Sequence, residues 1–228
     1  MTAAAALDLA AEVADAHASA TLVAADHIDV SFSSGGLAFT AKRQPDALAR
    51  VEARLSPVRQ QITLTGTTPR PWTVDVANSD DLKSRLAGLR SSSRRLRWQP
   101  EDLGVFAAAA IWTYLTLPLL LHRAEHLHRP ADAAGVRRLR ITLPATLAGH
   151  GSVQTLHVGP DSLICRHDYT ATAFGAWARA AQKVTSFQTF DGVPIGTART
   201  VRPRLGRPLP APTLVWIEIH SVQVAKPD

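Results

Sequence analysis

The sequence predicts a mainly β protein of the α+β class, in which an antiparallel open or half β-barrel curls around a buried helical segment. Two observations predict it. Apolar and polar residues alternate over most of 21–80 and again over 136–225, and one long apolar segment lies between these regions. Alternation is typical of half-exposed strands, and a sheet with one apolar helix is best closed by curling around it. We expect a single domain over residues 1–228.

Residues 1–20 predict an N-terminal helix, with apolar side chains at Leu7, Leu9, Ala10 and Val13. From residue 21 to residue 80, apolar and polar residues alternate with a period of two, and turn residues separate the expected strands. The strands expected in this region are "HIDVSFS" (27–33), "LAFTA" (37–41), "ALARVEARLS" (47–56), "QQITLTG" (60–66) and "WTVDVA" (72–77). Residues 81–90 fit a strand and a helix equally well.

The apolar stretch Val105–Leu121 lies within an expected helical plug over residues 101–128. It has 17 residues and contains Pro118. A membrane-spanning helix needs about 20 apolar residues, so we expect a helix buried against the sheet and no membrane span. Pro118 either kinks this helix or begins a second segment.

The second set of strands is expected over residues 136–225. Its segments are "VRRLRITLP" (136–144), "GSVQTLHVG" (151–159), "SLICRHDYT" (162–170), "KVTSFQTFDG" (183–192), "GVPIGTARTVRPR" (192–204) and "TLVWIEIHSVQVA" (213–225). Residues 174–182 are expected to form a loop or one to two helical turns. The chain would then have ten or eleven strands, enough to enclose a cavity of the kind that binds small molecules.

Composition narrows the class of protein. The chain has 228 residues, 46% of them hydrophobic and 19% charged, which is typical of a globular protein. Its single cysteine, Cys165, excludes a disulfide framework and a multi-cysteine metal site.

The first basic residue is Lys42, so the charged start of a secretory signal is missing and we expect a cytoplasmic protein. The net charge is +6, but its densest cluster, residues 90–100, is expected to be a solvated loop rather than a nucleic-acid site.

The stretch "LICRHDYTA" (163–171) concentrates reactive side chains. Strand geometry places Leu163, Cys165, His167 and Tyr169 on one face, and Ile164, Arg166 and Asp168 on the other. Cysteine and histidine two residues apart on a strand are separated by about 7 Å, which is too far for a thiolate–imidazolium pair. We therefore expect Cys165 to be a small apolar filler, and His167 and Tyr169 to be candidate catalytic groups.

The last strand has two chemically different faces. Val215, Ile217 and Ile219 form one face, and Trp216, Glu218 and His220 form the other. If the aliphatic face packs on the helices, the polar face is solvated. If the polar face lines the interior instead, Glu218 would be buried beside an imidazole, with a raised pKa suited to acid–base catalysis.

Other histidines and aromatic residues offer weaker sites. His122 and His126 have a helical metal-ligand spacing, with His128 close by, but neither an H-E-x-x-H order nor a clear third ligand is present. We expect a solvated helix end and no metal. Trp112 and Tyr114 on the apolar segment suit a pocket for an apolar ligand, and suit a core equally well. With Trp216 and Phe190 they form the expected substrate-binding set.

Two long segments resemble a family of uncharacterised soil-bacterial proteins. The run "GPDSLICRHDYTATAFGAWARAAQKVTSFQTFDGVPIGTARTVRPR" is similar to that family's D-G-L-L-R-R-H-D-Y strand followed by F-D-G-I-x-F-P-T-R-R-R-V-Y-P-R. The segment "RWQPEDLGVFAAAAIWTYLTLPLLL" is similar to its W-D-x-L-x-x-x-Y-F-x-x-Y-A-x-W-N-Y-L-x-x-P-F. The resemblance covers roughly residues 15–225. This chain departs from it at Arg202, where the family has tyrosine, and at Ala198 or Thr200, where it has arginine.

More distantly, this layout resembles the outer-membrane lipoprotein carrier fold, a half-barrel closed by helices. A cofactor-free enzyme of violacein biosynthesis uses the same fold. The resemblance implies a hydrophobic cavity without defining a chemistry, because one fold hosts many functions.

Two functions therefore remain. No P-loop, G-x-G-x-x-G or G-x-S-x-G motif is present in the sequence, so we expect no cofactor. The first function is a cofactor-independent cyclase or isomerase acting on a hydrophobic biosynthetic intermediate, with His167, Tyr169, Glu218 and His220 as catalytic candidates. The alternative is a protein that binds or carries a lipid or similar hydrophobic small molecule without catalysis. A basic scaffold without chemistry is a weaker third possibility.

Overall fold

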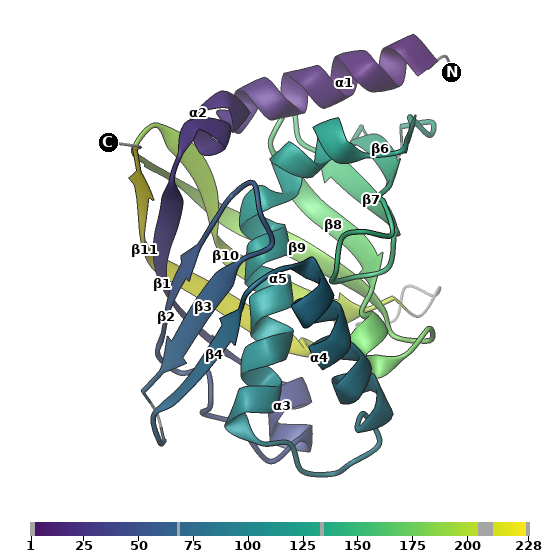
Figure 1. The fold of residues 1–228 in the computed structure, drawn as a ribbon. Coiled ribbons are helices and arrows are strands. Elements are labelled where there is room, and N and C mark those ends of the chain that lie inside the picture. The colour runs from purple at the N-terminus through teal and green to yellow at the C-terminus, as the bar shows by residue number, and fades with distance from the viewer. Residues whose placement is uncertain (1–2, 68, 133–134, 205–211, 227–228) are drawn as a thin grey trace.

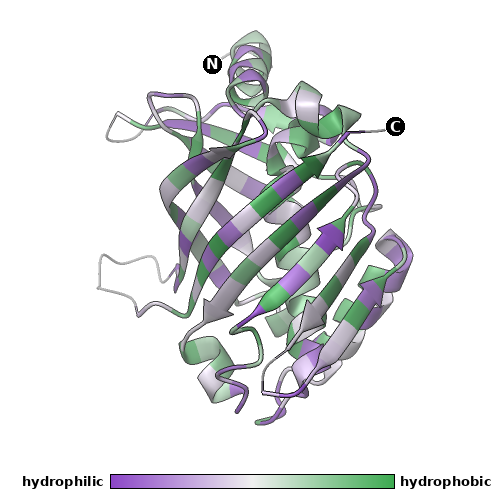
Figure 2. Cartoon of the chain, turned by 90° about the vertical axis from the view of Figure 1, so that its left-hand side faces the viewer, coloured by the Kyte–Doolittle hydropathy of each residue, from purple (hydrophilic) through white to green (hydrophobic). Residues whose placement is uncertain are grey.

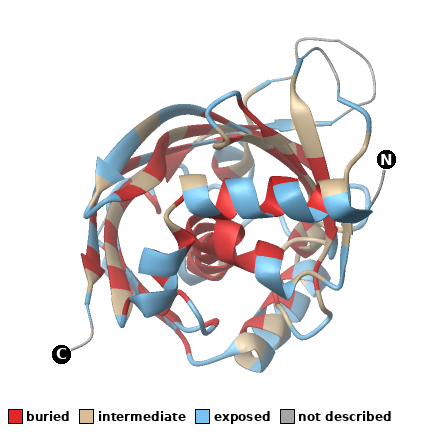
Figure 3. Cartoon of the chain, turned by 90° about the horizontal axis from the view of Figure 1, so that it is seen from above, coloured by how far each residue is buried: buried red, intermediate tan, exposed pale blue. Residues whose placement is uncertain are grey.

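Eleven antiparallel strands form one continuous sheet in the computed structural model of the chain, which describes residues 3–67, 69–132, 135–204 and 212–226. Their order across the sheet is β4-β3-β2-β1-β11-β10-β9-β8-β7-β6-β5. The sheet is open, because this order begins at β4 and ends at β5. It curls around a central helix, α5 (Pro100–Leu120) (Figure 1, Figure 3). The expected half-barrel around a buried helix is confirmed.

The first half of the sheet contains β1 (His27–Gly35), β2 (Val51–Leu55), β3 (Ile62–Gly66) and β4 (Trp72–Val76). Burial alternates along each of these strands, as the period-two pattern predicts. The apolar residues face α5 and the polar residues face solvent, and Figure 2 shows this alternation as stripes of hydropathy on the outer surface of the sheet.

The second half contains the remaining seven strands. They are β5 (His126–His128), β6 (Arg137–Thr142), β7 (Val153–Val158), β8 (Ile164–Thr170), β9 (Arg179–Phe190), β10 (Val193–Pro203) and β11 (Val215–Ala225). Strand β11 pairs with β10 on one side and with β1 on the other. The last strand in the sequence therefore joins the two halves of the sheet.

Helix α5 is apolar on every side and lies at the centre of the molecule. All of its residues from Leu103 to Leu120 are buried except Phe106, which is partly buried. The segment Pro100–Arg123 is long and apolar enough to cross a membrane by length and composition, but its most apolar 18-residue stretch is buried inside the fold. It is therefore the core helix that the sequence predicts, with Pro118 inside its last turn.

Shorter helices close the ends and the open side of the half-barrel. They are α1 (Ala3–Ala16), α2 (Ser19–Ala24), α3 (Leu37–Ala41), α4 (Ser79–Ser91) and the 3-10 turns η1 (Leu121–Arg123) and η2 (Thr172–Phe174). Helix α1 crosses one end of the half-barrel (Figure 1). Helix α4 packs on α5, β4 and η2, and so covers the open side. Asn78 caps the N-terminus of α4, and its side chain accepts hydrogen bonds from two backbone N–H groups of the first turn.

Some local predictions were wrong. Residues 37–41 form helix α3 and not a strand, because Gly36 has φ +130° and turns the chain out of β1. Residues 126–128 form strand β5 and not a helix end, since the chain leaves α5 through η1 and pairs with β6. Residues 179–182 belong to β9 and not to a loop. The ambiguous segment 81–90 is helical, within α4.

A close approach of α5 to the sheet depends on Gly104. A Cβ at this position would lie 2.5 Å from Trp72 Cζ3 and 2.8 Å from Val74 Cγ2. Gly104→Ala is therefore expected to lower the free energy of unfolding by about 1–3 kcal/mol, although alanine is the better helix former. Urea denaturation followed by circular dichroism measures the change.

Gly88→Ala is the matched control. Gly88 lies inside α4, and in the described structure nothing lies within 4 Å of a Cβ added there. This substitution is expected to raise the free energy of unfolding by about 0.5–1 kcal/mol. Equal effects at the two glycines would contradict the packing of α5 on β4.

Candidate functional site

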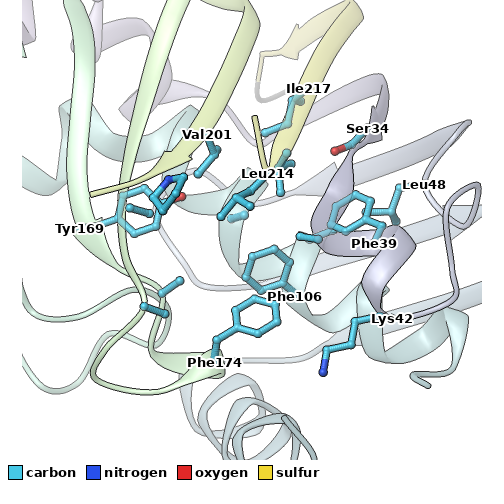
Figure 4. A pocket seen from close by; sticks show the side chains of 18 of the residues that line it. Ser34, Phe39, Lys42, Leu48, Phe106, Tyr169, Phe174, Val201, Leu214 and Ile217 are labelled. Carbon is cyan, nitrogen blue, oxygen red and sulfur yellow. The ribbon is translucent and has the colours of Figure 1, made fainter. Parts of the chain in front are cut away.

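A cavity of about 330 Å³ lies between α5 and the inner face of the sheet. Its walls come from α3, α5 and η2 and from strands β1 and β8 to β11 (Figure 4). Most of the lining side chains are aliphatic or aromatic, and Phe39, Phe106 and Phe174 project into the space. This volume is near the lower end of the range for small-molecule sites, and the lining has the composition typical of such sites.

Two buried tyrosines form the inner end of the cavity, called here the cavity floor. Tyr114 comes from α5 and Tyr169 from β8, and their hydroxyl oxygens are 2.7 Å apart. Burial raises the pKa of Tyr114 to about 12 and that of Tyr169 well above its usual value. Both hydroxyls are therefore protonated at neutral pH and act as hydrogen-bonding groups.

A row of buried polar side chains lies directly beyond the cavity floor, and we call it the polar row. It consists of Gln154 on β7, His167 on β8, Gln182 on β9 and Arg199 on β10. On β8, β9 and β10 these are the next inward-facing residues after Tyr169, Ala180 and Val201, which line the cavity. Two hydrogen bonds join its members in pairs, from Arg199 Nη1 to Gln182 Oε1 (3.2 Å) and from His167 Nε2 to Gln154 Oε1 (2.7 Å).

Arg199 carries the charge of the polar row. It is 7% exposed, it also donates to the carbonyl of Gly196 (2.9 Å), and its guanidinium carbon lies 5.4 Å from the centroid of the Tyr114 ring. Burial lowers the pKa of Arg199 to about 10, so the side chain is still a cation at neutral pH. Within the described ranges, no carboxylate lies within 4 Å of it.

Histidines of the interior are neutral. Burial lowers the pKa of His167 well below its usual value, and its Nε2–H donates to Gln154, whose own amide nitrogen donates to Gly151. His150 stacks on the ring of Tyr169 with centroids 3.7 Å apart, and burial lowers its pKa to about 3. His17 accepts a hydrogen bond from the backbone N–H of Ile164 (3.0 Å), and burial lowers its pKa to about 4.

The outer end of the cavity has a different character. Lys42 Nζ donates to the carbonyls of Ser93 and Arg95 and lies 4.8 Å from the centroid of the Trp98 ring. These contacts hold the loop after α4 against α3. Trp177 also lines this end and is 81% exposed, so the cavity opens to solvent here.

Tyr114, Tyr169 and His167 are the sequence-predicted site residues that the structure brings together. The two tyrosines line the cavity and His167 lies in the polar row. Trp112 is buried outside the cavity, and its indole N–H donates to the carbonyls of Ser56 and Arg59 (2.9 Å each), so it fastens a turn. Phe190 lies at the far end of β9 and does not line the cavity.

Three other predicted residues lie on the outer face of the sheet. Val215, Ile217 and Ile219 are buried, so Trp216, Glu218 and His220 point outward. The ring of Trp216 covers Gly35, and His220 Nε2 lies 2.9 Å from the Ser33 hydroxyl. Of the two orientations considered for this strand, the structure has the one with a solvated polar face. Glu218 and His220 therefore do not reach the cavity.

The opening of β8 departs from simple alternation. His157 pairs with Arg166 but Val158 pairs with Ile164, so β8 has one extra residue here, a β-bulge at Cys165. Cys165 therefore does not share the inner face with His167, and its thiol donates to the carbonyl of His157 (3.3 Å). Asp168 points outward as expected, within hydrogen-bonding distance of Arg166 and His157.

Sequence reasoning missed Arg199, Gln182 and Gln154. A signal for Arg199 was present, since it occupies an inward position between Thr197 and Val201 on a strand whose inner side is otherwise uncharged. Where the structure describes the chain, no group of three or more His, Cys, Asp or Glu side chains is arranged to hold a metal ion. His122, His126 and His128 are exposed to solvent.

No protein-family model matches this chain, and no curated protein matches it in sequence. Among solved structures, it is similar to a LolA superfamily protein from Nitrosomonas europaea, with 10% identity, a TM-score of 0.48 and 94% of each chain covered. It is also similar to a DUF1329 family protein from Desulfovibrio piger, with 12% identity, a TM-score of 0.44, and 97% of this chain and 92% of that one covered. Similarity at this level does not indicate a function.

Acid is expected to destabilise the fold before the carboxylates titrate. The folded-state pKa of His17 is about 4 against 6.5 for a free histidine, so the unfolded state binds more protons between these values. Each such histidine lowers the free energy of unfolding by up to about 1.4 kcal/mol per pH unit as the pH falls through this window. Urea denaturation at pH 7.5, 6 and 5 measures the slope.

His17→Gln separates this contribution from the others. Glutamine keeps an acceptor for the Ile164 N–H but does not titrate, so the slope below pH 6.5 should decrease by up to about 1.4 kcal/mol per unit. An unchanged slope would show that His17 is not held neutral in the fold.

Proposed function

We propose that this protein binds a hydrophobic small molecule in the cavity between α5 and the sheet. The observation that carries the proposal is a cavity of about 330 Å³ with an almost wholly apolar lining and an opening to solvent at Trp177. An apolar space of this size is filled most favourably by an apolar ligand, because each Å² of apolar surface removed from water contributes about 25 cal/mol.

Catalysis as a cyclase or isomerase has less support. None of the described residues that line the cavity has a carboxylate or an imidazole. The tyrosine hydroxyls of the cavity floor have raised pKa values and are therefore weak acids, and Glu218 and His220 lie on the outer face. The geometry offers hydrogen bonds and an apolar surface, which suit binding or carriage better than proton transfer. The cytoplasmic location expected from the sequence stays a prediction.

Filling the cavity tests the proposal. Ala110 is buried on α5 and its side chain lines the space. Ala110→Leu is expected to weaken the binding of Nile red, a neutral apolar dye, at least tenfold, because the added carbons occupy the ligand's volume. A fluorescence titration gives the affinity and the stoichiometry, which should be one dye per wild-type chain.

Ala11→Leu is the control, since it adds the same atoms to an exposed position of α1 on another part of the molecule. It should leave dye binding unchanged. If the wild-type protein binds no dye, or if Ala110→Leu binds it as tightly as Ala11→Leu does, the cavity is not a binding site.

A further inference from the structure

Arg199 is a buried cation without an anionic partner, and this is energetically unfavourable. Removing an ion from water costs several kcal/mol even after the surroundings relax, and buried charges are normally paired. In the described part of the chain, only neutral oxygens, those of Gly196 and Gln182, and the face of the Tyr114 ring compensate the guanidinium. Such a group is best explained by an anion that is brought by another molecule.

Further unused hydrogen-bonding capacity lies close to Arg199. Gln182 is 1% exposed, and its amide nitrogen makes no well-formed hydrogen bond in the structure as described, although its side chain lies close enough to the Tyr114 hydroxyl to lower the pKa of that group. The Tyr114 and Tyr169 hydroxyls face each other, so that one donates to the other and the second proton is still available. The inner end of the cavity therefore presents the two tyrosine hydroxyls, and Arg199 and Gln182 lie behind them without lining the space. No carboxylate is present among the described residues that line the cavity.

Three other cationic side chains line the cavity, and none of them is buried without compensation. Lys42 donates to two backbone carbonyls, and Arg204 lies 3.5 Å from the carboxylate of Asp168. Arg179 is exposed, so water solvates its charge. The buried cation without an anionic partner is thus Arg199, beyond the cavity floor, while Phe106, Phe174 and Leu214 supply apolar walls.

We propose that the ligand of this cavity is an amphiphile with a carboxylate head group, bound head-first. One carboxylate oxygen accepts a hydrogen bond from the tyrosine hydroxyl whose proton is not used in the Tyr114–Tyr169 hydrogen bond, and Arg199 behind the Tyr114 ring supplies the counter-charge. The apolar tail extends along the aromatic walls toward Trp177. Charge-assisted hydrogen bonds in a low-dielectric interior are about twice as strong as neutral ones. This inference rests on the proposed function and names the class of molecule, whether a free fatty acid or a carboxylated biosynthetic intermediate.

Displacement of Nile red by decanoate and by decan-1-ol at pH 8 tests the proposal. The two probes have the same chain length, and only decanoate is an anion at this pH. Wild-type protein is expected to bind decanoate at least tenfold more tightly than decanol. Arg199→Gln should abolish this preference while the affinity for decanol changes less than threefold, and Tyr169→Phe should reduce the preference. Arg199→Lys, which keeps the charge, should retain part of it.

The possible outcomes separate the two proposals. If Nile red binds but decanoate and decanol displace it equally well, the head-group assignment is wrong and the apolar cavity stands. If Arg199→Gln is folded and still prefers decanoate, Arg199 is not the counter-charge. If Arg199→Gln does not fold, the test rests on the other two proteins. A wild-type preference for decanoate that is reduced in Tyr169→Phe supports the head-group assignment, and an equal preference in both proteins contradicts it. If the wild-type protein binds neither the dye nor either probe, the proposed function fails and this inference with it.

Discussion

The whole structure depends on covering one helix that is apolar on every side. A surface helix buries only one apolar stripe against its protein, but α5 is buried around its full circumference from Leu103 to Leu120. A flat sheet could cover only one side of such a helix. The curled sheet covers most of it, and α1 and α4 cover what the open barrel leaves. The small residues of α5, such as Ala107 and Ala110, then leave the space that becomes the cavity.

The polar row is the second constraint on the interior. Four neighbouring strands each bury one polar side chain near the two tyrosines, where aliphatic residues would pack at lower cost. Buried polar groups with unused donors reduce stability unless something satisfies them. Most of the side chains that line the cavity are thus apolar, while the polar row lies behind the tyrosines at its inner end.

Much of the fold could be predicted from the sequence, because alternation and the apolar segment are local signals of long elements. Helix α3 could not be predicted, since its five residues alternate in polarity as a strand does. The turn that Gly36 makes out of β1 is visible only in the structure. The faces of Cys165 and the residues before it could not be predicted either, because one extra residue in β8 moves each preceding side chain of the strand to the opposite face of the sheet. Tyr114 and Tyr169 were predictable as cavity groups. Arg199 was missed: alternation places it on the inner face of β10 between Thr197 and Val201, but the sequence does not show which side chains of other elements surround it.

Strand β11 has a consequence for how the protein is made. It pairs His27–Gly35 of β1 with the segment Val215–Ala225, so contacts between the most distant parts of the sequence hold the two halves together. During synthesis the first four strands and α5 leave the ribosome long before β11 exists. Val215 and Ile217 of β11 are also part of the cavity wall. A newly made chain therefore exposes its most apolar helix until almost its whole length has been translated, and it is during this interval that chaperones would be needed most.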